Sequence, residues 1–213
     1  MSDILKATKL DFFLMKPYIK HFCLIIAVPI AYTVLGRSLL SGISFAMCLV
    51  AVTAVYPFSV MEKNGMERLY GILPVSYRSL VLGRYCYICI LGFAALLFAI
   101  LVHPAILRAM GMSVPESEIR VAVIFGIIVF CLYIVFQLPA YYKFGTIKGR
   151  VFIYIPTVGF FATLYFFPKI DVSGISTIIG NPVMLAAFLL LICIAAYLIS
   201  IAVSIHIVKN KEV

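Results

Sequence analysis

The chain has 213 residues, of which 65% are hydrophobic and only 12% carry a charge. Soluble domains are about half apolar and about a quarter charged, so this composition excludes an ordinary soluble protein. The apolar residues form charge-free blocks that are long enough to cross, or nearly to cross, a lipid bilayer. The sequence therefore predicts a polytopic membrane protein, and we interpret the net charge of +9 as a signal of membrane topology instead of nucleic-acid binding.

The first 20 residues predict an amphipathic helix that lies in the membrane interface. Four lysines fall within about a quarter of a helical wheel, and apolar side chains lie broadly opposite them. Such a helix places its apolar side in lipid and its lysines among the headgroups, although a solvated basic tail is an alternative. Asp11 does not fit this pattern. The basic side consists of Lys6, Lys9, Lys16 and Lys20, and the apolar side of Ile4, Ala7, Leu14, Met15 and Tyr18.

Six apolar blocks predict six transmembrane helices, because a helix satisfies its own backbone hydrogen bonds in lipid. Pro57 lies inside the second block, where it removes a hydrogen-bond donor and favours a bend. With the N-terminal helix, these blocks give one all-α transmembrane domain over residues 1–213. The predicted spans are residues 21–35, 43–61, 85–107, 121–140, 151–167 and 182–208.

The distribution of basic residues predicts the orientation of the spans. Thirteen of the 17 Lys and Arg residues lie in the N-terminal arm, the second-to-third and fourth-to-fifth connections, and the C-terminal tail. Loops rich in Lys and Arg stay in the cytoplasm. Both termini and the second-to-third connection are therefore expected on the cytoplasmic side of the membrane.

The sequence lacks the motifs of several chemical functions. It has no G-x-x-x-x-G-K-[ST] phosphate loop, no G-x-S-x-G nucleophile motif and no Cys, His or carboxylate cluster at metal spacing. Cys86 and Cys89 have the spacing of a redox pair, but they begin an apolar helix and we interpret them as packing residues. No carboxylate lies deep in a predicted span, which disfavours an ion-coupled transporter. We therefore expect no catalytic residue, cofactor or metal site in this chain, and we interpret Gln137 as an interhelical packing residue.

The second-to-third connection interrupts the apolar sequence with a polar segment, MEKNGMERLYGILPVSYRSLVLGRY, at residues 61–85. Apolar residues recur in it at positions i, i+3, i+4 and i+7, which is the pattern of an amphipathic helix. Pro74 cannot continue this helix and disfavours a helical conformation at Leu73. A simple connection would not need such a helix, so we expect a partner to dock there. The four apolar residues are Met66, Leu69, Tyr70 and Leu73.

The end of the polar segment predicts the start of another helix. Ser76 follows the proline at a position that suits an N-cap, and the new helix would carry Arg78 and Arg84 into the third span. Both arginines also suit a role as anchors at the cytoplasmic membrane surface. For Arg84 we prefer this interpretation.

The polar segment resembles the cytoplasmic segment between the second and third spans of small bacterial ABC type-2 exporter permeases. In that family an acidic start is followed by an amphipathic coupling helix, an L-P-V-S-R pattern and a basic approach to the third span. One departure is Tyr77, which places the arginine one residue late. The matching residues are Glu62, Gly65, Glu67, Arg68, Leu73, Pro74, Val75, Ser76, Arg78 and Arg84.

The resemblance implies a permease subunit that is not itself an enzyme. A second copy or a paralogue would complete a dimer, and a separate ABC ATPase would hold ATP and Mg²⁺ and supply the energy. The coupling helix, residues 62–74, would dock on that ATPase. The expected docking residues are Glu62, Met66, Glu67, Arg68, Leu69, Tyr70, Leu73 and Arg78.

The resemblance also implies export of amphipathic peptides, or of other hydrophobic cargo, across a bacterial cytoplasmic membrane. The main alternative is a non-transporting immunity or assembly factor of the same fold that sequesters a peptide. A membrane-embedded enzyme is disfavoured because no set of catalytic residues converges from several spans. Peptide-stimulated ATP turnover would separate an exporter from a sequestering factor.

Overall fold

The computed structural model describes residues 3–66, 76–166 and 182–211, and within these ranges the regular secondary structure is helical. The predicted all-α fold is therefore confirmed. The elements in chain order are α1 (Asp3–Met15), η1 (Lys16–Tyr18), α2 (Ile19–Gly36), α3 (Leu39–Val52), α4 (Val55–Lys63), α6 (Tyr77–Ala109), α7 (Glu116–Gly149), η2 (Arg150–Ile153), α8 (Tyr154–Phe166) and α10 (Pro182–Lys211).

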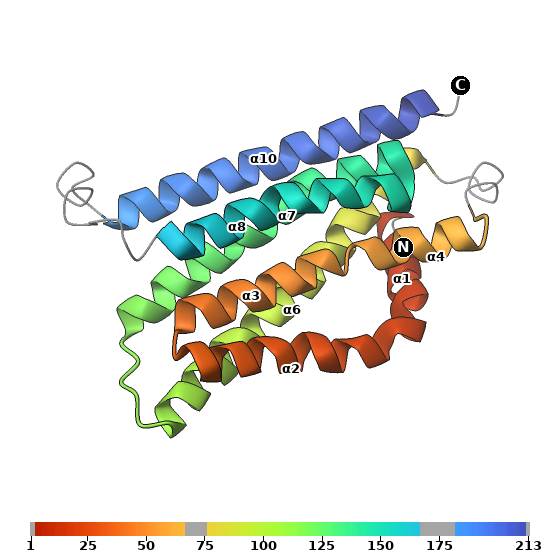
Figure 1. The fold of residues 1–213 in the computed structure, drawn as a ribbon. Coiled ribbons are helices and arrows are strands. Elements are labelled where there is room, and N and C mark those ends of the chain that lie inside the picture. Colours follow the sequence, from red (N-terminus) through yellow and green to blue (C-terminus); the bar gives the residue numbers. More distant parts are fainter. Residues whose placement is uncertain (1–2, 67–75, 167–181, 212–213) are drawn as a thin grey trace.

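Four helical stretches in the described residues are long and apolar enough to cross a membrane. One of them continues from α7 through η2 into α8, but Figure 1 shows that the chain reverses there, so that α7 and α8 run in opposite directions. A shorter apolar helix covers Ile25–Gly36 in α2. The described residues of every predicted span lie in helices, with the second span divided between two of them, and the spans themselves stay a prediction. The four stretches are Leu39–Lys63, Tyr77–Ala109, Glu116–Ala162 and Ala186–Lys211.

The helix boundaries follow from local sequence. Ser76 caps α6, because its hydroxyl accepts a hydrogen bond from the Ser79 backbone N–H at 3.3 Å, and this cap was expected from the sequence. The second predicted span is divided into α3 and α4 between Val52 and Val55. Pro57 explains the break, since it has no N–H to donate to the carbonyl of Thr53 one turn earlier.

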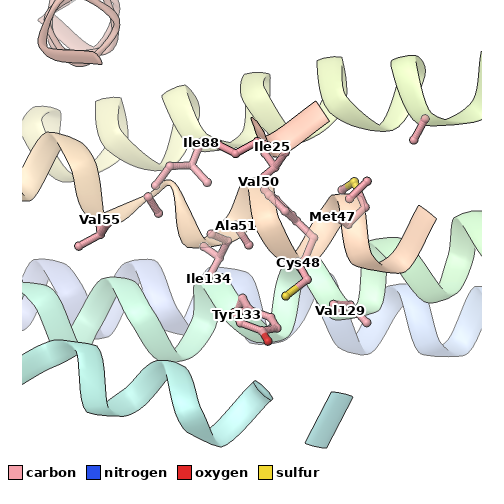
Figure 2. Close-up of a cluster of buried hydrophobic side chains, with 14 of the residues drawn as sticks. Ile25, Met47, Cys48, Val50, Ala51, Val55, Ile88, Val129, Tyr133 and Ile134 are labelled. Atoms are coloured by element: carbon pink, nitrogen blue, oxygen red, sulfur yellow. The ribbon is translucent and has the colours of Figure 1, made fainter. Parts of the chain in front are cut away.

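The core of the bundle is built around α3. In an 18-residue apolar window of the stretch that contains α3, 67% of the residues are buried, against 17% in such a window of the stretch that contains α10. Figure 2 shows α3 side chains packed between Ile88 of α6 and Tyr133 and Ile134 of α7. Because α10 leaves most of its apolar surface exposed, it lies at the periphery of the bundle. The α3 residues in this cluster include Met47, Cys48, Val50 and Ala51.

The described helices place most of the basic residues at one end of the bundle, which we call the basic end. Figure 1 shows there the N-terminal helix α1, the end of α4, the start of α6, the reversal between α7 and α8, and the end of α10. The α2–α3 and α6–α7 connections lie at the opposite end. The segments predicted to be cytoplasmic thus share one end. Its basic residues include Lys6, Lys9, Lys16, Lys63, Arg78, Lys148, Arg150, Lys209 and Lys211.

Candidate functional site at the basic end

The predicted docking segment is bounded by two well-defined helix ends. Gly65 adopts a left-handed conformation with φ 61°, which a glycine adopts without steric cost. The Gly65 N–H donates to the Glu62 carbonyl at 3.2 Å, and the Met66 N–H donates to the Met61 carbonyl at 3.0 Å. These two bonds form a Schellman motif, which ends α4 after Lys63.

The Schellman turn changes the start of the expected docking helix. Glu62 belongs to the last turn of α4, and residues 64–66 form a turn that separates it from the rest of the segment. Met66 is described and half-buried, and Arg78 is exposed in the first turn of α6. Five expected docking residues lie outside the described residues, so their role stays a prediction. They are Glu67, Arg68, Leu69, Tyr70 and Leu73.

Glu62 makes a contact within the chain that sequence reasoning did not anticipate. Its carboxylate accepts hydrogen bonds from the Thr146 backbone N–H, at 2.9 Å, and from the Thr146 hydroxyl. Thr146 follows Gly145, which has φ 75° and ψ −177° and interrupts the helical backbone of α7. A side chain other than hydrogen would strain the backbone at that φ. Glu62 therefore ties the end of α4 to the point where α7 turns towards α8.

Arg84 forms a second, buried contact at this end. Its Nε donates to Asp11 Oδ2 at 3.1 Å and its Nη2 donates to Asp11 Oδ1 at 2.8 Å, which is a bidentate ion pair. The side chains of Arg84 and Asp11 are only 6% and 3% exposed. The interpretation of Arg84 as a membrane-surface anchor is thus wrong, because a buried guanidinium needs a carboxylate partner instead of headgroups.

Arg84 also contacts α4. Its Nη2 lies 2.7 Å from the Met61 sulfur, and its guanidinium lies 4.2 Å from the centroid of the Phe58 ring. A cation over an aromatic face is attracted by the electrons of the ring. One side chain of α6 therefore joins α1 and the last turns of α4.

The N-terminal helix α1 packs closely on α6. The Thr8 hydroxyl donates to the Gly83 carbonyl at 3.0 Å. A Cβ at Gly83 would lie 2.5 Å from the Ala7 Cβ, so a glycine is needed for this approach. The lysines of α1 are exposed, as the interfacial helix requires, but its buried face touches protein and includes Asp11. The buried residues of α1 are Ala7, Thr8, Asp11 and Met15.

The two contacts border one cavity of about 280 Å³ between α4, α6, α7 and α10. Met61, Glu62, Arg84 and Thr146 all line it. The last turn of α4 is thus held on one side through Arg84 and on the other through Thr146. Movement of that turn would be passed to α1, α6 and α7.

Three further expectations concern metal binding, the two cysteines of α6 and the amide of Gln137. No group of three or more His, Cys, Asp or Glu residues there could hold a metal ion. Cys86 and Cys89 are free thiols. Gln137 is fully buried and its amide has no hydrogen-bond partner among the residues that the structure describes, so the expected packing role is not accompanied there by an interhelical hydrogen bond.

Comparison with known proteins identifies the family. The family model of the ABC-2 family transporter protein matches residues 8–209, which extends from α1 to α10. No curated protein and no solved structure matches the chain. The family match and the apolar helices together describe an integral membrane protein. The chain belongs to the ABC-2 transporter family and is a permease subunit of an ABC transporter.

Proposed function

We propose that this permease is driven by a separate ABC ATPase that docks at the basic end. The proposal rests on one observation: a well-defined helix end lies on each side of the predicted docking segment. The Schellman motif ends α4 at the basic end, and the Ser76 cap begins α6 at the same end. A partner at this end therefore has access to both helices at once.

The proposed docking residues follow the Schellman turn. A coupling helix would begin after Gly65 and present Met66, Leu69, Tyr70 and Leu73 to the ATPase, because these positions share one helical face. Glu67, Arg68 and Arg78 would contact the edge of the ATPase surface. Glu62 would act through the fold, since its carboxylate already binds Thr146.

Energy would reach the membrane helices through α4 and α6. The sequence has no phosphate loop, so ATP and Mg²⁺ belong to the partner. Closure of two ATPases would displace the docking segment and, with it, the helices on both sides. A permease dimer, with a second copy or a paralogue, would then switch between two states. The exposed apolar surface of α10 supports an interface in the membrane.

The orientation and the cargo complete the proposal. The basic end would face the cytoplasm of a bacterial cell, with both termini on that side, because Lys and Arg favour the cytoplasmic face. Cargo would leave the cell and would be an amphipathic peptide or another hydrophobic molecule. A hydrophobic groove of about 320 Å³ between α6, α7 and α10 supports this class, and its lining includes Gly92, Phe93 and Phe130.

Substitution of the docking face tests the proposal. Leu69→Asp or Tyr70→Asp places a charge on the face that should enter the ATPase, so co-purification of the ATPase and transport into inside-out vesicles should both be lost. Leu35→Asp is the matched control, because Leu35 is 83% exposed and is the last residue but one of α2. The α2–α3 connection that follows it lies at the opposite end of the bundle (Figure 1). Normal ATPase binding and transport in both docking-face variants would refute the docking face. Peptide capture without stimulated ATP turnover would favour the sequestering factor.

A further inference from the structure

Arg84 connects the two helices that lead into and out of the docking segment. It lies in α6, which begins directly after the segment, and its Nη2 lies 2.7 Å from the sulfur of Met61 in the last turn of α4. Phe58, one turn earlier in α4, stacks on the same guanidinium. One side chain thus links the helix that precedes the docking segment with the helix that follows it.

This connection depends on α1. A buried guanidinium is costly unless a carboxylate neutralises it, and Asp11 supplies two acceptor oxygens in a site that is almost closed to solvent. Asp11 can supply them only while α1 stays packed on α6. The contacts of Ala7 and Thr8 with Gly83 maintain that packing.

We propose that α1 positions the ATPase-docking segment, and that the Asp11–Arg84 ion pair is the contact through which it does so. The inference rests on the proposed function. Displacement of α1 would leave Arg84 without its carboxylate, and its contacts with Met61 and Phe58 would weaken. The end of α4 would then separate from α6, and binding of the ATPase at the basic end would weaken.

A purely stabilising role for the ion pair makes a different prediction. A stabilising contact changes the unfolding temperature but leaves ATPase binding unchanged where the protein is fully folded. A positioning contact changes the location of α1 and the affinity for the ATPase together, well below the unfolding temperature. The test therefore has to measure both quantities on folded protein.

The first measurement locates α1 in the permease alone. Spin labels at Lys9 and Lys148, which are exposed on α1 and α7, report their separation by pulsed EPR in a chain without other cysteines. Asp11→Asn removes the charge at nearly constant size and should lengthen and broaden the measured distance. Asp3→Asn is the matched control, because Asp3 pairs with Lys6 on the same helix but both side chains are more than half exposed. The control should leave the distance unchanged.

The second measurement is the affinity of the same variants for the ATPase. Asp11→Asn should weaken binding by about tenfold or more, and Asp3→Asn should not. The double variant Asp11→Leu with Arg84→Met removes both charges, and such replacements of a buried pair are tolerated by folds. A methionine side chain at position 84 can pack on Met61 and Phe58 in place of the guanidinium, because methionine adapts to irregular apolar surroundings. The double variant should therefore keep α1 in place and restore affinity to within about twofold of the unmodified chain.

A steric variant moves α1 without altering any charge. Gly83→Ala places a Cβ 2.5 Å from the Ala7 Cβ, so α1 must shift. It should lengthen the spin-label distance and weaken ATPase binding, as Asp11→Asn does. Gly36→Ala is the control, because a Cβ added there would lie 3.6 Å from the Ser41 hydroxyl oxygen, which is an ordinary van der Waals distance. This variant keeps the inference testable if Asp11→Asn does not fold.

The possible outcomes separate this inference from the proposed function. Displacement of α1 with unchanged ATPase affinity overturns the positioning role, and so does weakened affinity with α1 in place. If the unmodified permease binds no ABC ATPase, the proposed function fails and the positioning role fails with it. The EPR distances would still show whether the ion pair holds α1.

Discussion

The two ends of the bundle use charged side chains in different ways. At the basic end, Asp11 and Arg84 are buried, lie 73 residues apart in sequence and connect α1 with α6. At the opposite end, Glu116 and Arg120 form an exposed pair within one turn of α7, with a nitrogen–oxygen distance of 3.7 Å. Exposed pairs contribute little to stability, whereas a buried pair loses much when one partner is removed. The comparison indicates that charge fixes the arrangement of helices at the basic end.

At the opposite end, uncharged contacts fix the arrangement of the helices. The Thr33 hydroxyl and His103 Nδ1 form a buried hydrogen bond between α2 and α6. Gly42 of α3 packs against the same pair, so three helices meet at one point. An uncharged, tightly packed contact of this kind suits a fixed part of the fold. The charged contacts of the basic end instead border a cavity of about 280 Å³.

The largest expected loss of stability comes from breaking the buried ion pair between Asp11 and Arg84. Arg84→Ala leaves the Asp11 carboxylate buried without its partner and should lower the free energy of unfolding by about 3 to 5 kcal/mol. Arg120→Ala is the matched control at the opposite end, where the loss should be small because the pair is exposed. Unfolding in mixed detergent micelles measures both values. Equal losses would remove the distinction between the two ends.

A smaller loss of stability is expected when a methyl group is added at Gly42, in the contact at the opposite end. A Cβ at Gly42 would overlap with the Thr33 hydroxyl oxygen and would lie 2.8 Å from His103 Nδ1. Gly42→Ala should therefore cost about 1 to 3 kcal/mol of unfolding free energy. ATP turnover per transported cargo should stay normal, because the substitution is far from the docking segment. Gly36→Ala, with ordinary van der Waals space around it, serves as the control. Uncoupled ATP turnover in Gly42→Ala would contradict the assignment of a fixed role to this end.

The smallest effect on stability is expected from Glu62→Gln. The amide keeps an acceptor oxygen for Thr146 but loses the charge that strengthens the bond, so the cost should be about 1 kcal/mol or less. The effect on function should be larger, since the tie between α4 and α7 weakens. Coupled ATP turnover measures it, with Glu116→Gln as the control. A loss of coupling equal in both variants would show that Glu62 has no special role.

Local signals allowed much of the fold to be predicted. The apolar blocks indicated the helices, because helix formation in lipid depends on composition and length. The place of Ser76 after a proline predicts its role as a cap. The end of α4 at Asn64 and Gly65 is a feature that the sequence-based predictions lack, although asparagine followed by glycine is a local signal for a helix end.

The polar contacts of the basic end could not be predicted in the same way. Asp11 departs from the amphipathic pattern of its helix, whereas Arg84 fits the basic approach to the third span, and nothing in the sequence pairs residues so far apart. The same holds for Glu62 and Thr146, which are 84 residues apart. Burial makes such pairs necessary, and burial depends on how α1, α4, α6 and α7 pack together.

Docking of an ABC ATPase at the basic end can be tested by photo-crosslinking in membranes that contain the complete transporter. One photoreactive residue replaces Leu69, and another replaces Leu35 as a probe of the opposite end. We expect a crosslink to a protein with a nucleotide-binding phosphate loop from position 69 and none from position 35. A crosslink to such a protein only from position 35, or from neither position, would show that the ATPase does not dock at the basic end.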